Sequence, residues 1–142
     1  MAVVGIKVNK IEGNRNEQAK IDGPVRIGSA PRILSITESQ MNSGTGKVNV
    51  LEISFEYFTN YDPALGNIRV DGSIMYQANE DARKDIMSSW KSDKGLPKEV
   101  STEVLTQMTQ RSMLITMTMA RELGLPSPLP LKISDQPPQG AQ

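Results

Sequence analysis

Apolar and polar positions follow two different periods along this chain of 142 residues, and the period changes near Asn79. Before that residue, apolar and polar side chains alternate in several stretches, which is typical of β-strands with one buried face. After it, apolar residues recur every three or four positions, as they do on the buried side of an α-helix. Strands followed by helices favour the α+β class with an antiparallel sheet.

Four strands are predicted from the alternation. The clearest covers 50–57, where Leu51, Ile53, Phe55 and Tyr57 share one face and mostly polar residues take the other. The other strands are placed at 3–11, 31–40 and 68–76, with a short extra strand at 25–27 inside an otherwise polar loop, 12–30.

The third and fourth strands are expected to pair as a long antiparallel hairpin. A nine-residue connection, 59–67, carries the turn-forming pairs Asp62-Pro63 and Gly66-Asn67 between them. Gly72 interrupts the alternation of the fourth strand, which indicates a bulge or a close approach of another backbone.

The first strand places Val4, Ile6 and Val8 on one face, with polar residues and a glycine between them. Ile11 breaks this pattern by one position. A bulge or the end of the strand is therefore expected near Lys10.

A short amphipathic helix is predicted at 80–93. Asn79 is a good N-cap residue, and acidic residues follow it in the first turn, where the helix dipole favours them. Ala82, Ile86 and Trp90 are spaced four residues apart and form one apolar stripe.

A long helix is predicted at 97–123, and its second half is the most unusual part of the chain. Residues 113–120, MLITMTMA, are apolar nearly all round the helix. Gly124 suits a left-handed cap, after which Leu125 is expected to fold back on Ala120. Such a helix has two faces to bury: one can lie on the sheet, and the other needs a second partner.

The segment after the helix is rich in proline and leucine. Prolines at 126, 128 and 130 exclude further helix, so 125–133 is expected to be extended and to pack on its own fold or on a neighbour. Its Pro-Ser-Pro-Leu-Pro run also resembles a ligand of proline-binding modules. Residues 134–142 are expected to be disordered, which leaves one domain, 1–133.

The chain contains no cysteine and no histidine. This excludes disulfides, thiol nucleophiles, zinc sites built from these residues and the histidine proton shuttle. Carboxylates with Mg²⁺ would be the remaining route, but the cluster Glu80, Asp81 and Asp85 is explained by the helix dipole alone. We expect no enzymatic activity, no catalytic residue, no metal and no cofactor.

Sixteen basic and sixteen acidic residues cancel, so no overall field draws the chain to nucleic acid or to an anionic membrane. No apolar run reaches the roughly 20 residues that cross a bilayer. Lys7 interrupts the first ten residues, which therefore do not form a secretory leader. A cytoplasmic protein that binds no nucleic acid and does not insert into a membrane is expected.

Aromatic residues and methionines are the candidates for binding another polypeptide. Aromatic side chains gather around the central hairpin, methionines lie in the apolar part of the long helix, and a leucine follows in the tail: Tyr57, Phe58, Tyr61, Met113, Met117 and Leu129. Aromatic rings could line an apolar groove, and thioethers adapt to varied partners. The same residue types more often serve the core or an interface between subunits.

The order of the elements, together with MARELGLPSPLPLKI at 119–133, resembles the preprotein-export chaperone SecB. The likeness is closer to SecB-like proteins of archaea and some bacteria, over FEYFTNYDPALGNIRVDGSIMY at 55–76 and WKSDKGLPKEVSTEVLTQM at 90–108. It implies a four-stranded sheet with a short and a long helix on one face. It also implies assembly into a dimer or tetramer and binding of extended, apolar polypeptide.

The chain departs from that family in two respects. SecB chaperones are acidic, and many carry a zinc-binding tail with cysteine and histidine that docks on the export motor, whereas this chain is neutral and has neither residue. The resemblance therefore implies a chaperone-like protein that holds unfolded or partner chains. The alternative is a structural subunit whose apolar helix serves homo- or hetero-oligomer assembly.

Overall fold

The computed structural model describes residues 1–20, 22–93 and 95–128. Four strands come first: β1 (Ala2–Arg15), β2 (Arg26–Ser43), β3 (Gly46–Asp62) and β4 (Gly66–Gln77). Two helices follow, α1 (Glu80–Asp93) and α2 (Lys98–Leu123). The predicted α+β class, with a four-stranded antiparallel sheet before a short and a long helix, is confirmed.

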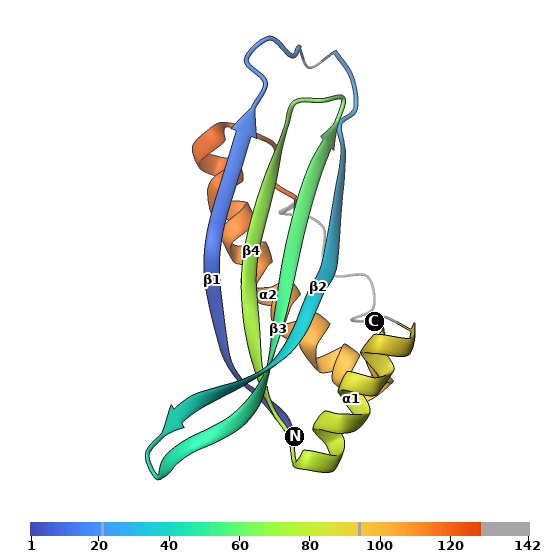
Figure 1. The fold of residues 1–142 in the computed structure, drawn as a ribbon. Coiled ribbons are helices and arrows are strands. Elements are labelled where there is room, and N and C mark those ends of the chain that lie inside the picture. The colour runs from blue at the N-terminus through green and yellow to red at the C-terminus, as the bar shows by residue number, and fades with distance from the viewer. Residues whose placement is uncertain (21, 94, 129–142) are drawn as a thin grey trace, which may run out of the picture.

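The strands form one antiparallel sheet in the order β1-β4-β3-β2. The expected β3–β4 hairpin occupies its centre, and β1 and β2 are its edges. Helix α2 crosses behind the sheet, and none of the described helices lies on the face turned to the viewer (Figure 1). The β2–β3 hairpin continues beyond the end of β4 as a two-stranded ribbon (Figure 1).

Two connections are much shorter than the sequence predicts. Strand β1 continues to Arg15 and β2 is continuous from Arg26, so the predicted loop 12–30 shrinks at both ends, and residues 26–27 of the predicted short strand belong to β2. Strand β3 continues to Asp62 and β4 begins at Gly66, so the predicted connection 59–67 shrinks to three residues. In both places polar and turn-forming residues lie within strands, because sheet pairing satisfies their backbone groups and overrides local propensity.

Strand β1 contains two bulges. The predicted bulge near Lys10 is confirmed, because the pairing with β4 shifts between Val8 and Lys10. A second shift, between Val3 and Gly5, was not expected. It turns Val4 outward, where it is 39% exposed, while Val3, Ile6 and Val8 pack against the core.

Both helices begin and end close to the predicted positions. The Asn79 side chain accepts a hydrogen bond from the Ala82 amide (2.8 Å), which caps α1. Helix α2 ends at Gly124 with the left-handed φ of 67°, and the Leu125 amide donates to the Ala120 carbonyl (2.8 Å). The chain therefore reverses direction after α2, as the sequence predicts.

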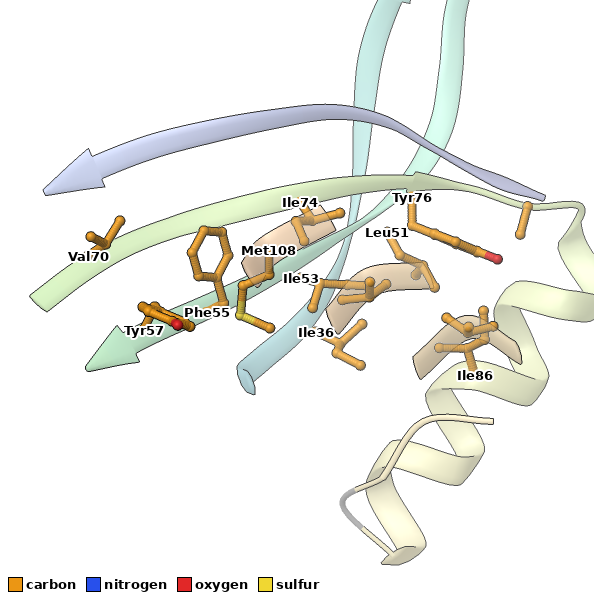
Figure 2. Packing of buried hydrophobic residues seen from close by; sticks show 13 residues of the cluster. Ile36, Leu51, Ile53, Phe55, Tyr57, Val70, Ile74, Tyr76, Ile86 and Met108 are labelled. Atoms are coloured by element: carbon orange, nitrogen blue, oxygen red, sulfur yellow. The ribbon is translucent and has the colours of Figure 1, made fainter. Parts of the chain in front are cut away.

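The core lies between the sheet and the helices, in two clusters. The larger contains the inward side chains of β3 and β4 with Ile86 of α1 and Met108 of α2. Figure 2 shows Met108 beside Phe55, and Ile86 toward the end of the cluster where Leu51 and Tyr76 lie. The smaller cluster lies near the end of α2 and contains Tyr61, Leu65, Ile68, Ala120 and Leu125.

Gly72 marks a close approach of another backbone. The sequence left this possibility open beside a bulge. A Cβ at this position would collide with the backbone carbonyl oxygen of Lys7 and lie 2.9 Å from the ring of Phe55. The neighbouring strand and the aromatic ring of the core can therefore pack this closely because position 72 has no side chain.

Gly72→Ala should lower the free energy of unfolding by about 1–3 kcal/mol, since a fixed backbone and a packed ring must both move. Gly28→Ala is the matched control, because a Cβ there meets no atom within 4 Å. Urea denaturation of the two variants measures the difference. Equal stabilities would show that β1 and the Phe55 ring can move to admit a methyl group at position 72 without lowering the free energy of unfolding.

Candidate functional site

Helix α2 turns a stripe of residues, each four positions from the next, toward the sheet. Its buried members are Val100, Val104, Met108, Ser112, Thr116 and Ala120. Side chains four apart lie one above another on a helix, so this stripe is one face. The first of the two faces predicted for α2 is therefore buried on the sheet.

Two polar residues interrupt this stripe. Within the described part of the chain, the hydroxyls of Ser112 and Thr116 are buried and have no hydrogen-bond partner. They lie between Met108, which belongs to the larger core cluster, and Ala120, which belongs to the smaller. The small side chains at 112, 116 and 120 leave little bulk between this half of α2 and the sheet.

The opposite side of α2 carries an exposed apolar ridge at Leu114, which is 66% exposed. Two grooves flank this ridge. The tail-side groove, about 510 Å³, is lined by Leu114, Met117, Thr118, Arg121, Leu125 and Ser127. The β1-side groove, about 420 Å³, is lined by Ile11, Arg111, Leu114, Ile115, Thr118 and Met119.

Both grooves are apolar with one cation each. Met117 and Leu125 line the tail-side groove, and Ile115 and the 45%-exposed Ile11 line the β1-side groove. Arg121 contributes the guanidinium of the first groove and Arg111 that of the second. An apolar floor with a few polar donors is the usual composition of a site that binds a ligand by its side chains.

The structure separates the aromatic residues that the sequence analysis grouped. Tyr57 and Tyr61 are 2% and 1% exposed on the helix-covered side of β3. Phe58 points to the opposite face of the sheet, where Arg69 is its neighbour on β4. These three side chains do not line one groove in this arrangement.

The predicted methionines lie nearer to the grooves. Met117 lines the tail-side groove, and the half-buried Met113 packs against the larger core cluster. Leu129, and with it the predicted disordered tail 134–142, lies outside the described residues. Of the five candidates within the described residues, Met117 is the one that lines either of these two grooves.

Leu114, Ile115 and Ile11 are groove residues that the sequence analysis did not single out. The run 113–120 carried the signal for the first two, because an all-round apolar helix must expose some of its side chains. Ile11 could not be assigned to the same surface from the sequence, since its position depends on the bulges of β1.

The uncovered face of the sheet is charged. Arg69 donates a hydrogen bond from Nε to Asp71 (3.0 Å) and lies 3.8 Å from a Glu56 oxygen. The hydrogen bond to Asp71, then the charges of Asp71 and Glu56, raise the pKa of Arg69. Lys7 and Glu52 form a further pair at 3.9 Å on the same face. This face therefore favours water over apolar partners.

Tyr61 fixes the start of the C-terminal segment. Its hydroxyl donates to the Pro126 carbonyl (2.7 Å), and Leu125 packs beside it in the smaller core cluster. Burial raises the pKa of Tyr61 above its ordinary 10.0, which favours the neutral hydroxyl that donates this bond. Residues 125–126 are thus held against the fold, as predicted for the beginning of the tail.

The comparisons with known proteins bear on the fold. No family model and no curated protein matches the sequence. Among solved structures, the chain is similar to the Rv1957 SecB-like chaperone of Mycobacterium tuberculosis, solved in complex with a ChAD peptide from the Rv1956 HigA1 antitoxin. The TM-score is 0.52 at 11% sequence identity, over 95% of this chain and 91% of that one.

The chain has a SecB-like fold. This agrees with the resemblance drawn from the sequence, at the level of the sheet and the two helices. At 11% identity the likeness shows the SecB-like fold alone.

The described residues contain neither a metal-binding cluster nor a membrane-spanning helix. In the described ranges, no group of three or more acidic residues is placed to hold a metal ion. No helix in the same ranges is long and apolar enough to span a bilayer.

Tyr61→Phe should release the segment after α2. The lost hydrogen bond is expected to lower the free energy of unfolding by about 0.5–1.5 kcal/mol. Hydrogen exchange of the Leu125 amide should accelerate, and Tyr76→Phe, an equally buried tyrosine of the other cluster, should leave it unchanged.

The same tyrosine gives the stability a pH dependence. Because its folded-state pKa is raised, the contribution of Tyr61 is complete below pH 10 and is lost as the pH rises through the folded pKa. The phenylalanine variant should show a smaller alkaline step in a urea titration, and the remaining step belongs to Tyr76, whose pKa burial also raises. An unchanged step in Tyr61→Phe would assign it to another group.

Proposed function

We propose that this protein binds unfolded or partner polypeptide in a chaperone-like manner, through the two grooves beside Leu114. The observation that carries the proposal is the exposed leucine ridge on a helix whose other side is already buried in the core. In the chain by itself this leucine stays exposed between two apolar grooves, whereas a bound apolar segment would bury it at about 25 cal/mol per Å².

The chemistry of the grooves suits an extended client of varied sequence. Met117 in one groove and Met119 in the other are unbranched, and their thioethers adapt to side chains of different shape. Arg111 and Arg121 can donate to backbone carbonyls, which every client carries. Such a surface selects apolar, extended segments without reading one particular sequence.

The structural comparison supports the same class of function. The similar SecB-like chaperone was solved with a peptide bound, so a protein of this fold binds a polypeptide segment. Polypeptide binding is proposed for the present chain on this basis, and a cytoplasmic location and the absence of catalysis are proposed from the sequence.

The chaperone proposal is tested by light scattering of a chemically denatured enzyme that aggregates on dilution. The wild-type protein at several-fold molar excess should suppress the scattering. Leu114→Lys should weaken client binding by about 10- to 100-fold, because a side chain worth about 1.5–3 kcal/mol on burial is replaced by a charge.

Thr106→Lys is the matched control, since Thr106 is an exposed α2 residue that lines neither groove. It should suppress aggregation like the wild type. Equal activity of Leu114→Lys and Thr106→Lys would remove the ridge from the client site, and no suppression by the wild type would refute the proposed function.

The alternative is that the same ridge serves assembly of a structural subunit, as a homo-oligomer or with another protein. The exposed Leu114 supports this reading too, because two apolar helix surfaces of this kind can pack on each other. The two hypotheses differ in whether the Leu114 ridge is accessible after assembly. A client site must stay accessible in the oligomer, whereas a purely structural interface is buried between the subunits.

Native mass spectrometry and sedimentation velocity decide between these readings. Assembly through α2 predicts a dimer or tetramer that Met117→Lys dissociates, because the substitution places a charge in the tail-side groove. Thr106→Lys should retain the wild-type association state. A stably folded Met117→Lys protein with unchanged association would show that this face is not the interface.

A further inference from the structure

The tail-side groove lies where the described chain ends. Gly124 reverses the chain, the Leu125 amide bonds back to Ala120, and Tyr61 holds the Pro126 carbonyl. Ser127, the next residue, is itself part of the groove wall. Whatever follows Pro128 in the sequence therefore starts beside this groove.

The sequence that follows has the chemistry of an extended apolar ligand. Residues 129–133 read LPLKI, and apolar side chains occupy every second position: Leu129, Leu131 and Ile133. In an extended backbone, alternate side chains lie on one side, so these three would share it and Lys132 would take the other. Pro130 favours the extended conformation and removes one backbone donor.

The reach of this segment matches the groove. Five extended residues span about 17 Å at roughly 3.3 Å each. The helical part of the groove, from Leu114 to Arg121, is about 10 Å long at 1.5 Å per residue. The segment can therefore run back along α2 from Ser127 past Leu114 without any change in the reversal at Gly124.

We propose that residues 129–133 bind in the tail-side groove of their own chain and act as a built-in competitor of the client polypeptide. The inference rests on the proposed function, because competition requires a client that uses this groove. A free chaperone would then keep its Leu114 ridge partly covered, and a client would bind by displacing the segment.

The docking is tested by disulfide formation in the full-length protein, which has no cysteine of its own. Leu131→Cys is combined either with Met117→Cys, in the tail-side groove, or with Ile115→Cys, in the β1-side groove. These two α2 positions are both half-buried and apolar, so they differ chiefly in the groove they line.

Mild oxidation should cross-link the Met117 pair within one chain at least tenfold faster than the Ile115 pair. Equal rates, no cross-link in either protein, or cross-links between two chains would overturn the proposal. This readout needs no client, so it can succeed or fail independently of the aggregation assay.

Competition is tested with a labelled synthetic peptide of residues 127–135, SPLPLKISD. The full-length variant Leu129→Ser/Leu131→Ser/Ile133→Ser should bind it at least tenfold more tightly than the wild type, whose own segment competes at a high effective concentration. A peptide carrying the same three serines is the control and should bind neither protein. Equal affinity of both proteins for the unmodified peptide would refute competition even if the docking holds.

Discussion

One long helix has to cover a four-stranded sheet that is wider than the helix, and the rest of the molecule depends on this difference in width. Four strands about 4.8 Å apart make a surface roughly 15 Å across, whereas a helix is about 10 Å in diameter. Helix α2 crosses the sheet obliquely and packs most closely on β1 and β4 (Figure 1). The remaining inward side chains of β2 and β3 need other cover. Leu125 and the chain reversal after α2 supply part of it at one end, and α1 supplies it at the other.

The buried side chains of α2 become smaller toward its C-terminal end. The helix therefore fills the core with its first half and exposes apolar side chains with its second. Its first half, with Val100, Val104 and Met108, fills the larger cluster as an ordinary core helix does. In its second half the fully buried members are a serine, a threonine and an alanine, and the hydroxyls of the first two are buried without partners in the described structure. Larger apolar residues of this half are thereby directed sideways and outward, toward Leu114 and the two grooves.

The sequence predicted the order and type of the four strands and two helices in the described ranges, because alternation and helical spacing are strong over long stretches. It also predicted the caps at Asn79 and Gly124, where one residue satisfies a local geometric need. The boundaries of β2 and β3 were wrong, since pairing with neighbours extends strands through polar and turn-like residues.

The candidate site was predicted in part. Met117 was a candidate because a helix that is apolar on all sides must expose some of its residues, and it lines the tail-side groove. Grouping Tyr57, Phe58 and Tyr61 failed to foresee their arrangement, because adjacent strand residues point to opposite faces and burial depends on which face α2 covers. Ile11 reaches the site through the register of β1, which a single sequence does not encode locally.

The hydrogen bond from Tyr61 to the Pro126 carbonyl shortens the free chain that links the fold to residues 129–133. With Pro126 held, the segment 129–133 that we propose to bind the groove begins only three residues away, and its local concentration is set by that distance and not by how much protein a cell makes. Short tethers give concentrations on the order of millimolar. A client would therefore face a threshold that is the same at every expression level, and the protein would ignore weakly apolar segments while still accepting strongly apolar ones.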